Sequence, residues 1–260
     1  MLKPRPDLLR LLLLTTLTMI AFAGNSLLCR QALESTEIDP ASFTTVRLVS
    51  GALMLWLIVR IRHGQYRGEG NWLSALALFS YAAGFSFAYV SLPAAVGALL
   101  LFGAVQATMI GHGLLAGEQL RGIRLLGVVL ALGGMVGLLM PGLSAPPLMG
   151  ALLMLGAGVA WGIYSIRGAG AGDALRKTTG NFVRSVPVTL LLSILLAGDA
   201  QWDSAGLSYA VASGALASGL GYAVWYTVLP ALKSTTAATV QLSVPVIAAA
   251  GGIVFLGEPL

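Results

Sequence analysis

Long apolar segments recur along this chain from one end to the other, and they constrain its fold more than any other feature. A hydrocarbon core of about 30 Å takes about 20 residues of α-helix to cross. Nine segments reach that length, at residues 8–29, 41–60, 72–91, 94–115, 122–140, 148–166, 179–197, 205–228 and 235–256. They lack the period-two alternation of a transmembrane β-strand, and an open sheet cannot satisfy its backbone hydrogen bonds in lipid. The sequence therefore predicts an all-α integral membrane protein.

Charged residues are too few for a soluble domain, and they lie in the short loops between these segments. Only 10% of the residues are charged and 57% are hydrophobic, whereas about 25% are charged in an average soluble domain. The net charge of +5 does not indicate a nucleic-acid partner, because basic residues in such loops orient membrane helices. The basic N-terminus imitates a cleavable signal peptide, but its apolar run continues to Cys29 and further spans follow. A first transmembrane helix is expected there.

Loop charge predicts the orientation of the chain. If the chain crosses at every segment, one side receives Lys3, Arg5, Arg10, Arg60, Arg62, Arg67, Arg121, Arg124, Arg167, Arg176, Lys177 and Lys233. The other side holds acidic residues such as Glu37 and Asp39, with Arg30 as its basic residue. The positive-inside rule then predicts a multi-pass protein of the cell (inner or plasma) membrane with a cytoplasmic N-terminus.

Two segments end in the same way, which indicates an internal duplication. Residues 92–120 and 232–260 align without a gap at an offset of 140 residues. Each is apolar and closes with a Gly-Glu pair, Gly117-Glu118 in the first and Gly257-Glu258 in the second.

Scarce arginines support the duplication, and the number of helices predicts its symmetry. Arg30 and Arg47 match Arg167 and Arg184 at a shared offset of 137 residues. The first repeat, 1–141, holds five segments, so the second repeat must enter the membrane from the opposite side. We expect two inverted five-helix bundles, an arrangement that secondary transporters use for alternating access. The second repeat, 142–260, holds four segments, so nine helices are present and a tenth is expected to be missing.

The chain resembles a known family at several matching motifs. These are Ala23-Gly24-Asn25, Ala160-Trp161-Gly162, Arg47, Arg184, the two Gly-Glu endings, and the stretch from Tyr222 through Trp225-Tyr226, residues 235–238, Leu242 and Pro245 to Glu258. Together they resemble the drug/metabolite transporter superfamily, specifically its EamA-type transporters, which have ten helices in two repeats. Departures are Val105 where the second repeat has Pro245, and the missing tenth helix. The resemblance implies transport of small metabolites through a central cavity lined by helices 1 to 4 and 6 to 9.

Polar and amphipathic side chains inside the spans are the candidates for substrate binding. An arginine at depth in a membrane costs at least about 2.5–3.5 kcal/mol, so it usually faces a cavity or a partner. Snorkelling to the interface stays open as the alternative for both span arginines. Aromatic walls with a few amide groups suit amino acids or drug-like metabolites. The candidate substrate-binding residues are Asn25, Arg47, Tyr81, Gln106, Trp161, Tyr164, Asn181, Arg184, Tyr222, Trp225 and Gln241.

Three other ionisable residues lie near predicted helix ends. Glu118 and Glu258 are expected to cap the helix that follows each of them, because a carboxylate complements the positive end of a helix. A proton-coupling carboxylate would be expected deeper in the membrane, and none of the nine segments contains an interior Asp or Glu. His112 could titrate during transport or serve as a bonded residue near the interface.

These features favour a secondary transporter that moves small metabolites, such as amino acids or drug-like compounds, by alternating access. A membrane-embedded enzyme would need a constellation such as His-Glu-x-x-His, and the chain has two histidines, His63 and His112. No catalytic residue, metal or cofactor is predicted. A structural or receptor-like helical protein without transport activity is the alternative. The expected partners are a small-molecule substrate and the lipid bilayer, with no nucleic acid, while a homodimer, the transport direction and the coupling ion stay open.

Overall fold

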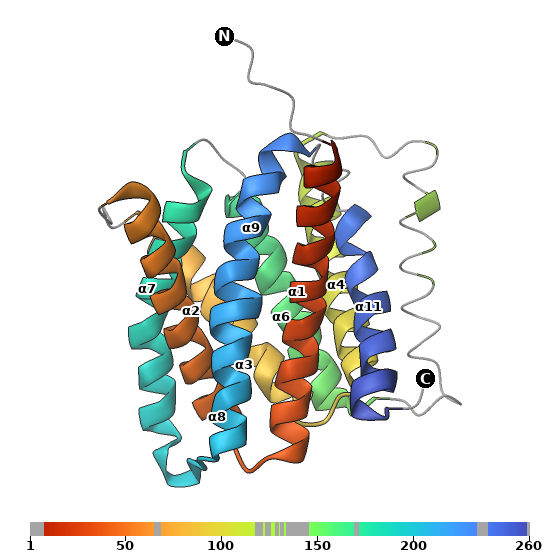
Figure 1. Cartoon of the computed structure of the whole chain (residues 1–260). Coiled ribbons are helices and arrows are strands. Elements are labelled where there is room, and N and C mark those ends of the chain that lie inside the picture. Colours follow the sequence, from red (N-terminus) through yellow and green to blue (C-terminus); the bar gives the residue numbers. More distant parts are fainter. Residues whose placement is uncertain are drawn as a thin grey trace.

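The computed structural model of the chain is a helical bundle (Figure 1). It describes residues 8–64, 69–117, 122, 126, 127, 130, 133, 146–168, 172–232 and 239–258. Within these residues every regular element is helical, and seven helical segments are long and apolar enough to cross a membrane. The prediction of an all-helical membrane protein is confirmed at that level. The predicted span 122–140 lies almost wholly outside the described residues, so the count of nine helices stays a prediction.

Helix bounds follow the predicted segments closely in the first half of the chain. The helices there are α1 (Leu8–Ser35), α2 (Pro40–His63), α3 (Trp72–Tyr89) and α4 (Ala94–Leu115). Two of these helices have an N-cap residue whose side-chain oxygen accepts hydrogen bonds from the first turn: Asp39 caps α2, and Asn71 caps α3. Such caps satisfy amide groups that the first turn of a helix leaves without partners.

The second half contains two uninterrupted α-helices and two rods that change their winding. The helices α6 (Leu148–Gly168) and α7 (Ala174–Leu195) are continuous. After a short 3₁₀ turn, η1 (Ala197–Asp199), one rod consists of α8 (Ser204–Val211), the π-helical η2 (Ala212–Leu220), α9 (Gly221–Val228) and the 3₁₀ turn η3 (Leu229–Ala231). The last described rod consists of α11 (Ser243–Gly251) and the π-helical η4 (Gly252–Leu256). A hydrogen bond at the end of η2 shows its wide winding, because the amide of Gly221 donates to the carbonyl of Leu216, five residues earlier.

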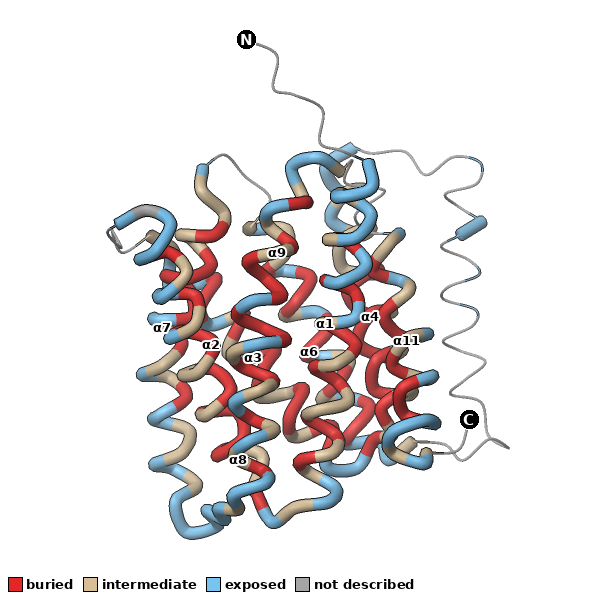
Figure 2. The backbone as a smooth tube through the Cα atoms, in the orientation of Figure 1, coloured by how far each residue is buried: buried red, intermediate tan, exposed pale blue. Residues whose placement is uncertain are grey.

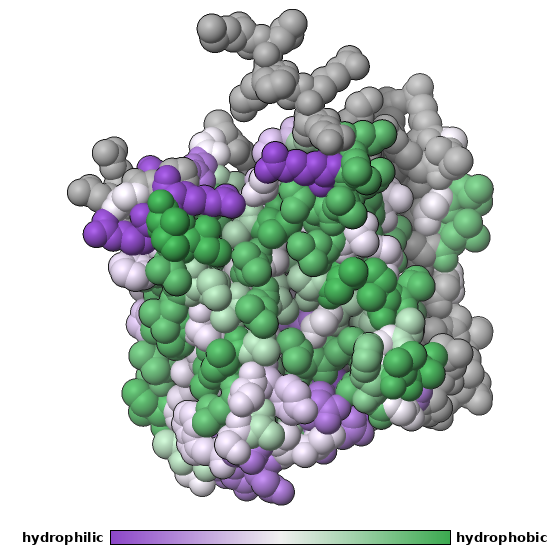
Figure 3. Space-filling view, viewed as in Figure 1, coloured by the Kyte–Doolittle hydropathy of each residue, from purple (hydrophilic) through white to green (hydrophobic). Residues whose placement is uncertain are grey.

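The helices of the two halves interleave. α3 and α4 pack against α6, whereas the α8–η2–α9 rod and α11 pack against α1, and α2 packs against both α7 and η2. Figure 1 shows that α1 and α6 run in opposite directions, as do α2 and α7. The buried stretches of the chain lie mostly toward the middle of the bundle (Figure 2). On the face shown in Figure 3, hydrophobic residues cover the flank of the bundle between more hydrophilic ends. This exterior suits a hydrocarbon environment.

The two glycines of the Gly-Glu endings share a backbone conformation. Gly117 follows α4 with φ 89°, and Gly257 follows η4 with φ 65°. Both values lie in the left-handed region, where a residue with a Cβ atom is strained. The repeated glycine therefore has a local physical reason, which is to stop a helix in the same way at two places.

Candidate functional site

A small closed cavity lies inside the bundle, bounded by α1, α3, α4, α6 and the η2–α9 rod. Its volume is about 20 Å³, which is room for roughly one water molecule. Residues from both halves of the chain line it: Phe22, Asn25, Ser26, Tyr81, Phe85, Leu101, Phe102, Trp161, Ala217, Ser218 and Tyr222. All of these residues are buried and the space is that of about one water molecule, so a solute larger than water requires the helices around it to move apart.

Aromatic rings from five helices form most of the wall, with Trp161 of α6 at their centre. Its ring centroid lies 4.9 Å from that of Tyr81, 5.2 Å from that of Tyr222 and 6.4 Å from that of Phe22. Tyr164 stacks on Trp161 at 5.4 Å. Contacts of this kind stabilise by about 0.5–1.5 kcal/mol each beyond the burial of their surface. Their faces can receive an aliphatic group or a cation.

A chain of hydrogen bonds crosses the site from η2 to α2. The hydroxyl of Ser213 donates to Oδ1 of Asn25 at 2.6 Å, and Nδ2 of Asn25 donates to the hydroxyl oxygen of Tyr81 at 3.2 Å. From the other side, Nη2 of Arg47 donates to the same oxygen at 2.9 Å. All four side chains belong to buried residues and come from four different helices. The polar part of the site therefore depends on the packing of both halves.

Arg47 is a buried cation, and within the part of the chain that the structure describes no carboxylate forms an ion pair with it. The residue is 2% exposed, and its guanidinium lies 5.2 Å from the ring centroid of Tyr81 and 4.8 Å from that of Phe85. Its Nε and Nη1 atoms have no hydrogen-bond partner among the described residues. Cation–π contacts compensate part of the cost of burying this charge. The Nε and Nη1 donors of Arg47 nevertheless stay unsatisfied, and buried donors without a partner are rare enough in proteins to indicate a function.

The π-helical segment brings two serines to the same side of its rod. Ser213 binds Asn25, and Ser218, five residues later, lines the cavity. Residues five apart lie about 140° apart around an α-helix, whereas a π-helix places them nearly one above the other. The hydroxyl of Ser218 is buried and has no partner among the described residues.

The structure brings six of the predicted site residues together. Asn25, Tyr81, Trp161 and Tyr222 line the cavity, Arg47 lies behind Tyr81, and Tyr164 stacks behind Trp161. The hydroxyl of Tyr164 donates to that of Thr178 at 3.2 Å, which anchors it to α7.

The other five predicted residues lie outside the cavity wall. Trp225 contacts the ring of Phe22 at 6.0 Å from the far side. Gln106 and Gln241 are buried, but neither lines the cavity. Asn181 and Arg184 bind the segment between α2 and α3 instead, at one end of the bundle.

At that end, several contacts tie the segment before α3 to α6 and α7. The amide of Asn71 donates to Oδ1 of Asn181 at 2.9 Å, and Nη1 of Arg184 donates to the carbonyl of Glu69 at 2.7 Å. Arg167 donates to the side chains of Ser74, at 3.2 Å, and Asn71, at 3.1 Å. These contacts close the bundle at the end where α6 finishes and α7 begins.

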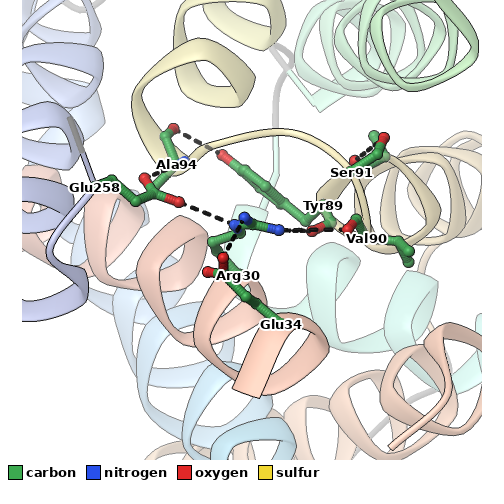
Figure 4. Close-up of polar contacts among 8 residues, drawn as sticks. Arg30, Glu34, Tyr89, Val90, Ser91, Ala94 and Glu258 are labelled. Atoms are coloured by element: carbon green, nitrogen blue, oxygen red, sulfur yellow. Dashed lines mark hydrogen bonds and ion pairs between the residues drawn. The ribbon is translucent and has the colours of Figure 1, made fainter. Parts of the chain in front are cut away.

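At the opposite end, an ion pair joins α1 to the residues after η4 (Figure 4). Nε of Arg30 lies 2.9 Å from Oε1 of Glu258, and the same guanidinium binds Glu34 at 2.7 Å and the carbonyl of Tyr89 at 3.1 Å. The other carboxylate oxygen of Glu258 accepts from the amide of Ala94, the first residue of α4, at 2.7 Å. The side chain of Glu258 thus caps α4, a helix of the first half of the chain, while the expectation that it caps a helix following it stays a prediction. Glu118 lies outside the described residues.

Asp39 adds a second tie at the same end. One of its carboxylate oxygens caps α2, and the other accepts from the amide of Gln201 at 2.9 Å. Burial alone would raise the pKa of Asp39, but hydrogen bonds from Ser42, Gln201 and Ala41 together hold it below its ordinary value. The carboxylate is therefore ionised at neutral pH and holds α2 to the segment before α8.

A second hollow lies between α1 and the η2–α9 rod, with a volume of about 270 Å³. Apart from Thr18, the residues around it are apolar or glycine: Leu17, Ala21, Gly24, Leu28, Leu216, Ala217, Leu220, Gly221 and Val224. The hydroxyl of Thr18 is already bound to the carbonyl of Leu14 at 2.9 Å. Its lining offers no polar recognition, so the closed central cavity is the candidate site. No cluster of His, Cys, Asp and Glu that could hold a metal occurs in the described part of the chain.

Eight residues of the site were not predicted from the sequence: Phe22, Ser26, Phe85, Leu101, Phe102, Ser213, Ala217 and Ser218. The sequence does not distinguish a phenylalanine that lines a cavity from one that faces lipid, because both are apolar residues within an apolar span. The two serines of η2 share a face only because of the π winding, and helical periodicity of 3.6 residues would separate them. The single signal in the sequence was the run of small residues around Gly214.

Comparison with known proteins relates the chain to transporters. The profile of the EamA-like transporter family matches residues 9–140 and 148–260. An uncharacterized protein of Pseudomonas aeruginosa is 58% identical over 252 residues, which is 96% of this chain and 88% of that protein. The threonine/homoserine exporter RhtA of Salmonella typhimurium is 34% identical over 138 residues, and that of Escherichia coli K12 is 33% identical over the same length. These alignments cover 51% of this chain and 46% of each exporter.

Proposed function

The chain belongs to the EamA-like transporter family, and from that premise we propose that it carries small solutes of the amino-acid type across the cell membrane by alternating access. The resemblance to EamA-type members of the drug/metabolite transporter superfamily is thereby confirmed. A membrane transporter of small molecules is the function that the family indicates, and the substrate class and mechanism are our proposal.

One observation carries the proposal: a small cavity with a polar chain and aromatic walls is lined by buried residues from both halves of the chain. The walls come from residues of both halves, so a shift of one half against the other changes the cavity. Arg30 and Glu258 tie the helices together at one end of the bundle, and Arg184 with Asn181 ties them at the other. Opening either set alone would expose the cavity to one side of the membrane.

Packing of the helices supports an inverted repeat, with repeats at 1–141 and 142–260. The contacts are reciprocal, because α3 packs on α6 as the α8–η2–α9 rod packs on α1. The equivalent helices α1 and α6 run in opposite directions (Figure 1). Transporters built in this way alternate access around a site near the middle of the membrane.

Two features support solutes of the amino-acid type. Relatives similar to this chain over 138 residues are threonine/homoserine exporters. The cavity combines buried hydrogen-bonding groups with aromatic faces, which suits a small molecule that has charged groups and a short side chain.

The distribution of charge supports insertion in the cell (inner or plasma) membrane with a cytoplasmic N-terminus. Described basic residues gather where α1 begins, α2 ends and α7 begins, among them Arg10, Arg62 and Lys177. The opposite end holds Glu34, Asp39 and Asp203 beside Arg30. The positive-inside rule assigns the first end to the cytoplasm.

Uptake into proteoliposomes tests the proposal. Protein reconstituted with internal L-threonine is expected to exchange it for labelled L-threonine or L-homoserine added outside. The Trp161→Ala variant removes the central ring and is expected to lose about tenfold or more of this exchange. The matched Trp202→Ala variant changes a residue that is 59% exposed in the loop before α8 and is expected to keep it.

If labelled amino acids, sugars and amines all fail to enter, the transport proposal is wrong. A structural or receptor-like role would then be the better interpretation.

A further inference from the structure

We propose that Arg47 and Tyr81 form a subsite for the carboxylate of the transported solute, with Asn25 and Ser213 as positioning residues. The inference rests on the proposed transport function and names the chemical group that the site recognises. It follows from three observations: the uncompensated charge of Arg47, the direction of the hydrogen bonds, and the position of Tyr81 on the cavity wall.

The charge of Arg47 has no counterion in the described part of the protein. Arg30 and Arg176, which do form ion pairs, both lie near the ends of the bundle. By its position in α2, Arg47 lies about 10 Å beyond the start of that helix, at 1.5 Å per residue. Burying a charge without a partner is unfavourable, and unsatisfied donors add to the cost. A negatively charged group of the solute would supply what the protein does not.

The hydrogen bonds point one way, toward the hydroxyl of Tyr81. Because Oδ1 of Asn25 accepts from Ser213, the amide of Asn25 presents its Nδ2 to Tyr81. Arg47 donates to the same hydroxyl oxygen, so both of its acceptor positions are taken. The hydroxyl proton of Tyr81 is then left to donate.

Tyr81 lies on the cavity wall, whereas Arg47 lies directly behind it. The cavity therefore presents a hydroxyl donor backed by a guanidinium, beside the unsatisfied hydroxyl of Ser218. Donors backed by a positive charge favour an anionic acceptor over a neutral one. A solute cation in this position would add donors where acceptors are needed, and a primary amide would supply an acceptor without the negative charge.

The amount of charge favours a carboxylate over a phosphate. One guanidinium compensates one negative charge, and a phosphate monoester carries about −1.5 to −2 at pH 7. The surplus would be buried among aromatic rings, which is unfavourable. The faces of Trp161 and Tyr222 opposite can hold the aliphatic part or an ammonium group of the solute.

Pairs of probes that differ only in the acid group test the subsite. The full chain in detergent is titrated with L-threonine and L-threonine amide, and with propionate and propionamide, while tryptophan fluorescence and thermal stabilisation are recorded. The wild type is expected to bind each carboxylate about tenfold or more tightly than its amide, the difference expected from one charge-assisted hydrogen bond. Arg47→Gln should abolish this preference, and Arg47→Lys should keep part of it.

Two further variants separate recognition from folding. Tyr81→Phe keeps the ring and removes the donated proton, so it should weaken binding of the carboxylates and leave that of the amides unchanged. Arg60→Gln makes the same change as Arg47→Gln at the exposed end of the same helix and should keep the full preference.

Equal binding of acid and amide by the wild type, or no binding of any probe, overturns the subsite. So does a preference that survives Arg47→Gln. If Arg47→Gln does not fold, the wild-type pairs and Tyr81→Phe decide the result. Absence of uptake into liposomes together with a clear preference for carboxylates contradicts the transport proposal alone.

Discussion

The ion pair between Arg30 and Glu258 provides a prediction at the scale of single residues. Both side chains are nearly buried, at 11% and 9% exposed. Removing one partner leaves the other charge without compensation, so Arg30→Gln or Glu258→Gln should lower the free energy of unfolding by about 3–5 kcal/mol. Equilibrium unfolding in mild detergent measures this loss.

The matched control for that pair is Glu34→Gln. Glu34 binds the same guanidinium at 2.7 Å, but its side chain is 43% exposed. Exposed pairs contribute about 1 kcal/mol or less, so this variant should remain close to the wild type. Similar losses of unfolding free energy for Glu34→Gln and Glu258→Gln would show that burial of Glu258 does not strengthen its ion pair.

Residues of the site could be predicted from the sequence where a polar or amphipathic side chain lies within an apolar span. Asn25, Tyr81, Trp161 and Tyr222 are polar or amphipathic, and all four line the cavity. The same reasoning also selected Asn181 and Arg184, which bind a loop instead. A residue type reveals that a side chain needs a polar partner, but not whether the partner is a solute or the backbone of another segment.

Close packing of α4 and α6 provides a prediction at the scale of elements. A Cβ atom on Gly158 would lie 2.5 Å from the carbonyl of Leu101 and 2.6 Å from Cβ of Ala104. Gly158→Ala should therefore push these helices apart and cost about 1–3 kcal/mol of stability. Thermal unfolding in detergent measures the cost.

Gly156, two residues earlier in the same helix, is the control. A Cβ atom there would meet nothing within 4 Å. Gly156→Ala should be neutral or slightly stabilising, because alanine favours a helix over glycine. If both variants lost the same stability, the cost would come from α6 itself and not from its contact with α4.

Predicted and observed elements agree best where one helix fills one apolar segment. The starts of α3 and α4, at Trp72 and Ala94, match the sequence prediction. α7 begins five residues earlier than predicted, at Ala174, because Asp173 caps it and the first turn is polar. The π winding of η2 was not predictable, because it changes the hydrogen-bond register without changing apolar composition.

The separation of charge between the two ends provides a prediction for the whole molecule. With a cytoplasmic N-terminus, the loop before α8 faces outward and the end of α2 faces inward. In intact cells, a membrane-impermeant maleimide should label Gln201→Cys and leave Arg62→Cys unlabelled until the cells are opened. The native Cys29 is buried and should give little background. Labelling of Arg62→Cys in intact cells would reverse the orientation.

Closure of the central cavity has a consequence for how the protein responds to its solvent. Its volume of about 20 Å³ holds roughly one water molecule, and any solute of amino-acid size needs several times that space. Under the proposed alternating access, each opening would draw water into the protein from one side. Osmolytes too large to enter oppose this hydration and favour the closed form. Because each transport cycle would take up and release water in this way, the transport rate should fall as the osmotic pressure rises.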